Sequence, residues 1–174
     1  MKNFLLGYFL LFYLSFLAQT SNVGGPVSWS FDKDADLMHI PHFQLSKSDV
    51  EKQIKINDSV ELWTKSGFIF GVEQEVDIDF HQNAYWQQTK KGRIGRLEIM
   101  SSEAISLNLI FDQFNLSEGS FLYLYSTDKK ELLGAYTSQN NNKQNILGTD
   151  LIHHEEIIVE LYEPNDEVGK SVLH

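Results

Sequence analysis

Six histidines are the first residues whose chemistry could be specific, because imidazole binds metals and exchanges a proton near neutral pH. They are His39, His42, His81, His153, His154 and His174. A zinc site needs three or four ligands in a fixed geometry. His39 and His42 could supply two of them, but no HExxH motif is present. His153 and His154 are adjacent, so on a strand they would point to opposite faces. The pattern predicts loop or surface histidines, with no metal and no other cofactor.

A cluster of acidic residues, FDKDADL, has the alternating carboxylates of a calcium loop at Asp32, Asp34 and Asp36. An EF-hand loop also needs Gly at its sixth position and Glu at its twelfth. Leu37 and Phe43 occupy those positions here. A solvated acidic arm is therefore the favoured interpretation, and a less regular calcium loop is the alternative.

A second group of carboxylates could suggest acid–base work on a glycosidic bond. It comprises Glu73, Glu75, Asp77 and Asp79. Their period-two spacing places all four in one row on a single face of an extended segment. Nothing apolar lies among them to separate their pKa values into an acid and a base. The spacing predicts a solvated face and no catalytic pair.

Nucleophilic chemistry finds little support. The chain has no cysteine, which excludes thiol catalysis and Fe–S clusters, and it has neither GDSGG nor GxSxG. Ser66, Ser101 and Ser102 lack the glycine context of a catalytic serine. Residues 92–96, GRIGR, resemble a phosphate loop but lack the following Lys-Ser/Thr, so they predict a turn leading into a strand. The sequence predicts no catalytic residue.

Trp29, Trp63 and Trp86 could form a stacking platform for sugars, but aromatic residues in β-rich domains are more often core or half-buried. Asn57 and Asn115 begin glycosylation sequons, which matter only in a glycosylating host. No cofactor-binding residue is predicted.

The elements that would position these residues are mostly strands. FIFGVEQEVDIDF at residues 68–80 alternates apolar and acidic positions, which predicts a strand with one buried and one wet face, bent near residues 71–74. Further strands are predicted at 93–101, 104–112, 120–126, 131–137 and 156–162. Regular spacing without helices of crossover length predicts an all-β domain over residues 67–164, an antiparallel β-sandwich or jelly roll.

Within residues 106–126, two apolar strands joined by a Gly-containing loop carry much of the predicted core. The alternation places three side chains on one face and three on another. The first set is Leu107, Leu109 and Phe111, and the second is Phe121, Tyr123 and Tyr125.

The chain begins with Lys2 followed by an apolar run that ends at Ala18, which predicts a signal peptide over residues 1–18 and a secreted protein. An uncleaved anchor is the alternative. Residues 19–66 are predicted to be an extended N-terminal arm with one short helix at 48–55, where Ser48 and Glu51 have capping-box spacing. Residues 165–174 are predicted to be a linker or a truncated boundary.

The formal net charge of the chain is −10 at pH 7. An acidic surface argues against nucleic acid as a partner, and against an anionic membrane once the signal is removed.

The order of segments in the second half carries a resemblance. "SSEAISLNLIFDQFNLSEGSFLYLYSTDKKELLGAYTSQNN" followed by "GTDLIHHEEIIVELYEP" resembles the N-terminal region of secreted lysyl-endopeptidase-like serine proteases, roughly from Gly67 to Pro164. Two departures from the family pattern stand out: Ser replaces proline in the turn at 116–120, and the turn at 149–156 lacks the family's Gly-Asp. Residues 161–164 keep the ending of the pattern.

The resemblance implies a non-enzymatic, pro-region-like module whose partner is a serine protease catalytic domain, in cis or in trans. The family's catalytic residues have no counterpart here. The sequence would then be an N-terminal fragment, a truncated product or a free-standing relative of that module. The first alternative is an independent extracellular module that binds a glycan or a cell-surface polymer. A hydrolase on a jelly-roll scaffold is the third hypothesis.

Overall fold

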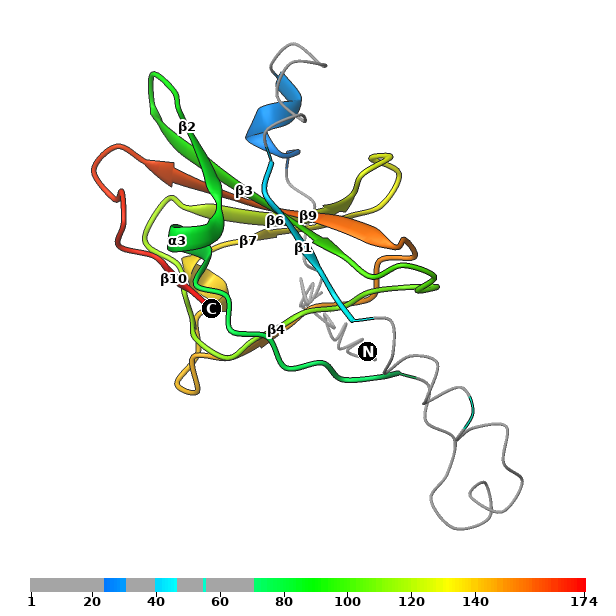
Figure 1. The fold of residues 1–174 in the computed structure, drawn as a ribbon. Coiled ribbons are helices and arrows are strands. Elements are labelled where there is room, and N and C mark those ends of the chain that lie inside the picture. The colour runs from blue at the N-terminus through cyan, green and yellow to red at the C-terminus, as the bar shows by residue number, and fades with distance from the viewer. Residues whose placement is uncertain (1–23, 31–39, 47–54, 56–70) are drawn as a thin grey trace, which may run out of the picture.

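The computed structural model describes residues 24–30, 40–46, 55 and 71–174. Strands dominate these residues, the α-helix α3 (Phe80–Asn83) has four residues, and Lys55, the one described residue of the predicted helix 48–55, is helical. The all-β class predicted from the sequence is confirmed. Figure 1 shows a large sheet crossing the molecule, with shorter strands and loops beneath it. Among the described residues, no helix has the length and apolar composition needed to span a bilayer.

The large sheet has six strands, and the long strand β9 runs through its middle. Its hydrogen-bonded order is β1 (His42–Gln44), β3 (Gly92–Met100), β9 (Glu156–Pro164), β6 (Phe121–Ser126) and β7 (Leu132–Tyr136). A sixth strand, β2 (Tyr85–Gln88), pairs with β3 beside β1. All pairs are antiparallel except β1 with β3, which is parallel and makes the sheet mixed.

Below this sheet lie two short ribbons of two strands each, which form the second layer of the domain (Figure 1). One ribbon pairs β4 (Ile110–Phe111) with β8 (Leu147–Gly148), and the other pairs β5 (Phe114–Asn115) with β10 (Val172–Leu173). The main core fills the space between the layers. Its largest members include Phe80, Phe111, Phe114, Leu116, Leu122, Leu124, Ile152, Ile157, Val159, Leu161 and Leu173.

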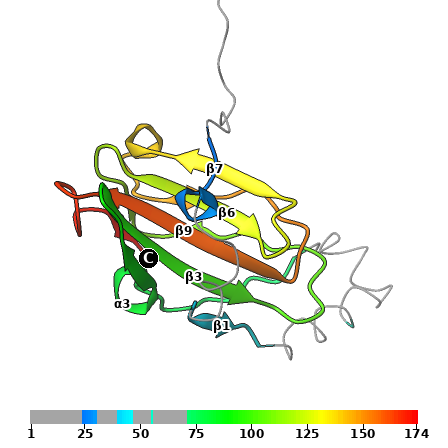
Figure 2. The ribbon, with the colours of Figure 1, turned by 90° about the horizontal axis from the view of Figure 1, so that it is seen from above.

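The opposite, outer face of the sheet carries a second buried cluster. It comprises Ile40, Tyr123, Tyr125 and Ile158, with Trp29 packed against it. Figure 2 shows the short 3₁₀ helix η1 (Val27–Ser30) lying over β6 and β9 on this face. Both faces of the central strands are therefore covered, the inner one by the ribbons and part of the outer one by residues from the N-terminal arm.

Four of the predicted strands are confirmed as the backbone of the large sheet. They are the segments 93–101, 120–126, 131–137 and 156–162, observed as β3, β6, β7 and β9. The two predicted faces within residues 106–126 are confirmed for five of the six side chains, and the sixth, Phe121, is exposed and stacks on Tyr162. Leu107, Leu109 and Phe111 belong to the inner core, whereas Tyr123 and Tyr125 belong to the outer cluster.

The strand predicted at 68–80 is wrong over its described part. Residues 71–79 form no strand, and Phe80 begins α3. The alternation of burial follows the prediction only in part. Ile78 packs against the core and Glu73 and Glu75 are exposed, but Val76, an apolar position of the predicted buried face, is 42% exposed. An extended segment can present one apolar side to a core without a neighbouring strand to pair with.

The strand predicted at 104–112 is also wrong for most of its length. It pairs with the segment 147–152 at two places, in the isolated bridge between Leu107 and Ile152 and in the two-residue strand β4. Residues 101–106 turn instead, with the Ala104 N–H donating to the carbonyl of Ser101 and Glu103 adopting a positive φ of 67°.

The predicted linker at 165–174 lies against the domain. Val172 and Leu173 form β10, Leu173 is buried, and the backbone N–H of His174 donates to the carbonyl of Gln113. The predicted signal peptide at 1–18 and residues 48–54 of the predicted helix lie outside the described residues.

Candidate functional site

The most unusual polar group of the outer face is the Glu160 carboxylate at the middle of β9, which is 0% exposed. Its Oε1 accepts the backbone N–H of Ser28 at 3.0 Å, and its Oε2 accepts the hydroxyl of the same serine. The Tyr125 hydroxyl also donates to Oε2, at 3.0 Å. A buried carboxylate is costly unless hydrogen-bond donors replace water, and these three donors do so.

Arg96 extends this polar cluster across the sheet. It lies directly opposite Glu160 in the β3–β9 register and is buried. Its guanidinium donates to the side-chain oxygen of Gln87 at 3.2 Å. The register therefore places a cation beside the buried carboxylate in the centre of the outer face.

Trp29 covers the cluster from the arm side. Its ring meets the Tyr125 ring edge-on, with centroids 5.3 Å apart and planes at 77°. Burial and then the Glu160 charge raise the pKa of Tyr125 well above its usual value, so the phenol stays a hydrogen-bond donor. The pKa of Tyr123 is raised for the same two reasons.

A second buried carboxylate, Glu163, closes one end of the inner core. Arg93 contacts its Oε2 through Nη2 at 2.7 Å and through Nε at 2.8 Å, and the Gly169 N–H donates to the same oxygen. Glu163 Oε1 has no hydrogen-bond partner among the described residues, and His81 Nε2 lies 3.7 Å from it.

Serines gather beside this carboxylate, which makes a hydrolase triad the obvious test. The hydroxyls of Ser117, Ser120 and Ser171 lie within 3.4 Å of one another. His81, however, bonds the backbone carbonyl of Ser171 through Nε2 at 2.8 Å, and its Nδ1 receives an N–H from Arg93. A triad needs the imidazole to accept the serine hydroxyl proton. This His81 has both nitrogens engaged elsewhere.

The indole of Trp86 is half-buried at that end of the core, and one of its faces is covered by neighbouring side chains. His81 stacks on it at 5.2 Å, and the Arg93 guanidinium lies 3.8 Å from its ring centre. Because Arg93 and His81 are 3.2 Å apart, both must lie on the same face of the indole. Trp29 is half-buried as described above, and Trp63 lies outside the described residues.

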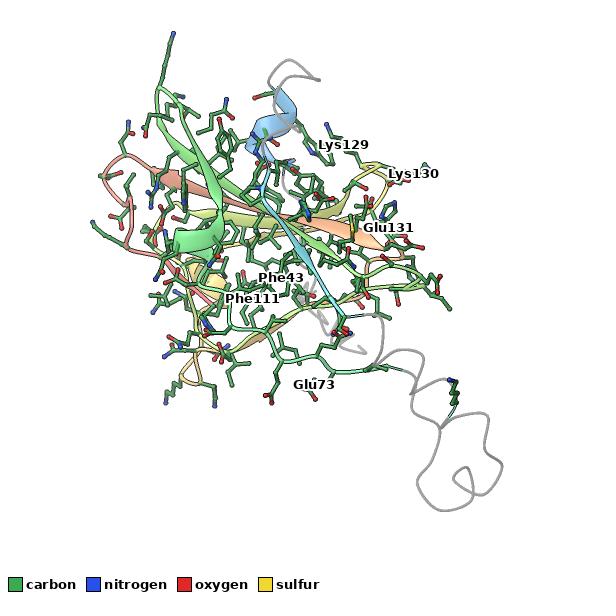
Figure 3. The ribbon with its side chains drawn as sticks, in the orientation of Figure 1. Phe43, Glu73, Phe111, Lys129, Lys130 and Glu131 are labelled. Carbon is green, nitrogen blue, oxygen red and sulfur yellow. The ribbon has the colours of Figure 1, made fainter. Side chains whose placement is uncertain are left out.

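The carboxylates of residues 73–79 do not form a catalytic pair. Glu73, Glu75 and Asp77 are exposed, and Figure 3 shows the Glu73 side chain pointing away from the body of the molecule. Asp79 is the N-cap of α3, where its side chain accepts the backbone N–H groups of His81 and Gln82. Its role there is structural.

The histidines are dispersed. His42 lies on the edge strand β1, His153 pairs with Glu131, and His154 accepts the backbone N–H of Glu156. His174 lies between two carboxylates, 2.8 Å from Asp77 and 2.9 Å from Asp112.

No cluster of three metal-ligating side chains occurs within the described ranges, and His39 and the acidic residues Asp32, Asp34 and Asp36 lie outside them.

Two further sequence motifs have structural positions. Residues 92–96 are part of β3 and follow a tight turn in which the Thr89 hydroxyl donates to the Gly92 carbonyl, as the prediction of a turn into a strand requires. Asn115 of the second sequon is exposed on β5, with its side-chain oxygen bonded to Asn141. Asn57 lies outside the described residues.

The ribbon formed by residues 105–111 and 146–152 exposes large apolar side chains, and we call this surface the apolar ribbon. The exposed members are Ile105 at 87%, Ile110 at 62%, Ile146 at 46% and Leu151 at 43%. Ile110 faces Gly148 in the register, and the space beside Gly148 is open. A grouped set of exposed isoleucines is the usual mark of an interaction surface.

The sequence analysis did not find Glu160 or Ser28. The single residue signal was a glutamate at the centre of the apolar segment EIIVELY, which alternation alone would place in water. The contact that buries it joins residues 132 positions apart, and no local pattern encodes such a pairing.

Comparison with known proteins gave no matching family model, no similar curated protein and no similar solved structure.

Proposed function

We propose that this chain is a secreted, non-catalytic module of a serine endopeptidase precursor, which assists the folding of a protease domain or masks it. The proposal rests on the segment order that resembles the N-terminal region of lysyl-endopeptidase-like proteases. It also agrees with a described structure in which His81 Nε2 bonds the Ser171 carbonyl and Glu163 Oε2 accepts a hydrogen bond from Arg93.

The observation that carries the proposal is the apolar ribbon. Exposed isoleucines on the second layer leave apolar area in water that a partner domain would cover. Burying one such side chain contributes about 1.5–3 kcal/mol, so two or three of them can anchor a domain interface. Binding to the folded protease, but not to its unfolded chain, would stabilise the folded form in proportion to occupancy.

The N-terminal arm is a weaker candidate for this contact. Its described parts are already bound in cis, because residues 24–30 cover the outer face and β1 pairs with β3. We therefore assign the protease contact to the apolar ribbon and not to these parts of the arm.

The experiment is co-refolding with the catalytic domain of a trypsin-like, lysyl-specific serine protease. We expect the chain to raise the yield of active enzyme, or to inhibit the folded enzyme when added in excess. The double variant Ile110→Asp/Ile146→Asp should lose this effect at least about tenfold, because a charge cannot be buried in an apolar contact without a partner.

The matched control is Val168→Asp, which places the same charge at an exposed apolar position on the loop after β9, away from the ribbon. It should leave the effect on the protease unchanged. If the unmodified chain neither raises the yield of active enzyme nor inhibits it, the proposal is wrong.

An independent glycan-binding module is the second candidate, and the described tryptophans do not favour it. Trp86 has His81 and Arg93 against its ring, and Trp29 packs against Tyr125. A glycan array probed with the chain would support this candidate if binding were lost on Trp63→Ala or Trp86→Ala with the fold intact.

A further inference from the structure

We propose that the outer face of the sheet around Glu160 is a peptide-binding site, and that residues 24–30 occupy it as a tethered ligand of the same chain. The ligand class is a short peptide in which a hydroxyl residue precedes an aromatic one, as Ser28 precedes Trp29. This inference stands on different residues from the protease proposal and does not depend on it. We call these surfaces the Glu160 site and the tethered segment.

The tethered segment is held as a ligand is held, through side chains of the site. Its η1 helix is closed by the internal bond from the Trp29 N–H to the Pro26 carbonyl. Between residues 24–30 and the sheet, no backbone–backbone hydrogen bond is present. Strand β1, in contrast, is joined to β3 through the backbone, with the Glu98 N–H donating to the Pro41 carbonyl. The segment is therefore docked on the sheet and is not a strand of it.

The polar recognition is directed at one residue. Glu160 accepts both the backbone N–H and the hydroxyl of Ser28, one on each carboxylate oxygen. Two donors from a single residue on a charged acceptor make a short-range, orientation-dependent contact of the stronger kind. Alanine at position 28 would lose one donor, and proline would lose both.

The aromatic recognition is next to it in sequence and in space. Trp29 packs edge-on against Tyr125, which itself donates to Glu160. On another side of the indole, Lys129 Nζ lies 5.9 Å from the ring centre. This lysine belongs to the hairpin between β6 and β7, labelled with Lys130 and Glu131 in Figure 3. Strand β6 and its hairpin thus supply an aromatic wall and a cation for one aromatic side chain.

The Glu160 site is buried only while the tethered segment covers it. Glu160 is 0% exposed and Tyr125 is 1% exposed with the segment in place. The segment contacts both, so its departure would expose an apolar wall and a carboxylate that has lost two of its three donors. A peptide carrying the same pair of anchors would restore those contacts.

The test uses the full chain with the substitutions Ser28→Pro and Trp29→Ala, which weaken the tethered segment. The probe is a fluorescein-labelled peptide with the sequence of residues 24–30, GGPVSWS, followed by fluorescence anisotropy. We expect saturable binding to the double variant. The unmodified chain should bind the probe at least about tenfold more weakly, because a short tether gives the competing segment an effective concentration on the order of millimolar.

Two controls distinguish specific binding of the probe at the Glu160 site from non-specific binding. A probe in which Ala replaces the serine that corresponds to Ser28 should bind at least about tenfold more weakly. Adding Glu160→Gln to the double variant should weaken the unaltered probe to a similar degree, since the amide offers one acceptor oxygen in place of two. Circular dichroism confirms that each variant keeps its strands.

If the double variant does not fold, Ser28→Ala alone replaces it, with the same probe and the same Glu160→Gln control. The proposal is overturned if no saturable binding occurs to a folded, weakened variant. It is equally overturned if binding occurs but Glu160→Gln leaves it unchanged, since the peptide would then be bound elsewhere.

Discussion

At the scale of single residues, the two buried glutamates of β9 show how neighbours decide the role of a carboxylate. Glu160 lies on the outer face and is bonded by a serine and a tyrosine, whereas Glu163 lies at the end of the inner core and is paired with Arg93. Both are fully buried, and both are held by groups from segments remote in sequence. We expect them to fix which segment docks on which face of the sheet, since an incorrect partner would leave a buried charge without donors.

We expect Tyr125→Phe to lower the free energy of unfolding by about 1–2 kcal/mol, because Glu160 loses a donor that water cannot replace while the segment stays docked. Urea unfolding followed by circular dichroism measures the change. Tyr162→Phe is the matched control, because its hydroxyl donates to the Lys91 carbonyl at an exposed position. A cost for Tyr125→Phe no greater than that of the control would contradict this role of the hydroxyl.

At the scale of the elements, the sequence was informative where strands are long and pair within the large sheet. The segments now seen as β3, β6, β7 and β9 have dense apolar positions, and their register partners bury both faces. The short strands β5, β8 and β10 have two residues each and were not predicted, and the two-residue β4 is all that forms as a strand within the predicted segment 104–112. Two residues carry no period, so such pairing is imposed by the core beneath them and is not encoded locally.

The alternation in residues 68–80 shows that a clear period does not by itself establish a strand. It correctly predicted that Glu73 and Glu75 are exposed to solvent and that Ile78 faces the core. The segment nevertheless has no pairing strand over its described part. Periodicity reports which side faces the core, whereas a strand also needs a hydrogen-bonding neighbour. For the Glu160 site the prediction failed for a related reason, since its two halves are 132 residues apart.

The contact of β3 with Trp86 gives a test of element packing. A Cβ at Gly95 would lie 2.8 Å from Trp86 and 2.9 Å from Phe80. We expect Gly95→Ala to cost about 1–3 kcal/mol of stability, because rigid rings must move to admit the methyl group. Thermal unfolding and the tryptophan emission spectrum of the protein report the effect. Gly148→Ala has open space around the new methyl group and should be close to neutral; equal effects at the two positions would refute the packing argument.

His174 ties the segment 71–79 to the end of β4 through Asp77 and Asp112. Hydrogen bonds to Asp112 first and Asp77 second raise its pKa above the ordinary value. A raised pKa in the folded state means that the protonated form stabilises the fold. The contribution of His174 to stability is fully present below the pKa that this histidine has in the unfolded chain. It is lost as the pH rises through the pKa of His174 in the folded state.

His174→Gln should therefore destabilise the protein at pH 5.5 and have little effect at pH 8.5. The difference should shrink in high salt, because both carboxylates are largely exposed. Denaturant titrations of both proteins at the two pH values measure it. An effect that is the same at both pH values would show that the bridge does not depend on protonation.

At the scale of the whole molecule, the two layers differ in what they leave uncovered. The large sheet is covered on its inner face and over the Glu160 site, whereas the apolar ribbon on the second layer stays in contact with water. The net charge of −10 counteracts self-association through such a surface. We expect this charge to limit self-association through the ribbon most strongly at low salt.

Ile110→Asp/Ile146→Asp should reduce the binding of a hydrophobic dye while changing the free energy of unfolding by no more than about 0.5 kcal/mol per site, as expected for surface positions. Dye fluorescence and urea unfolding on the same samples measure both. A large loss of stability would mean that these isoleucines support the fold and are not an available surface.

The central position of β9 in the sheet determines when the sheet can form during translation. β3 and β6 are both paired to it and not to each other, yet β9 follows both of them along the described chain. Until residues 156–164 have emerged, the centre of the sheet cannot close. Ser28 also lacks its hydrogen-bond acceptor until then, because that acceptor, the Glu160 carboxylate, lies on β9. We therefore expect a nascent chain of this protein to remain without its large sheet until residues 156–164 have been released.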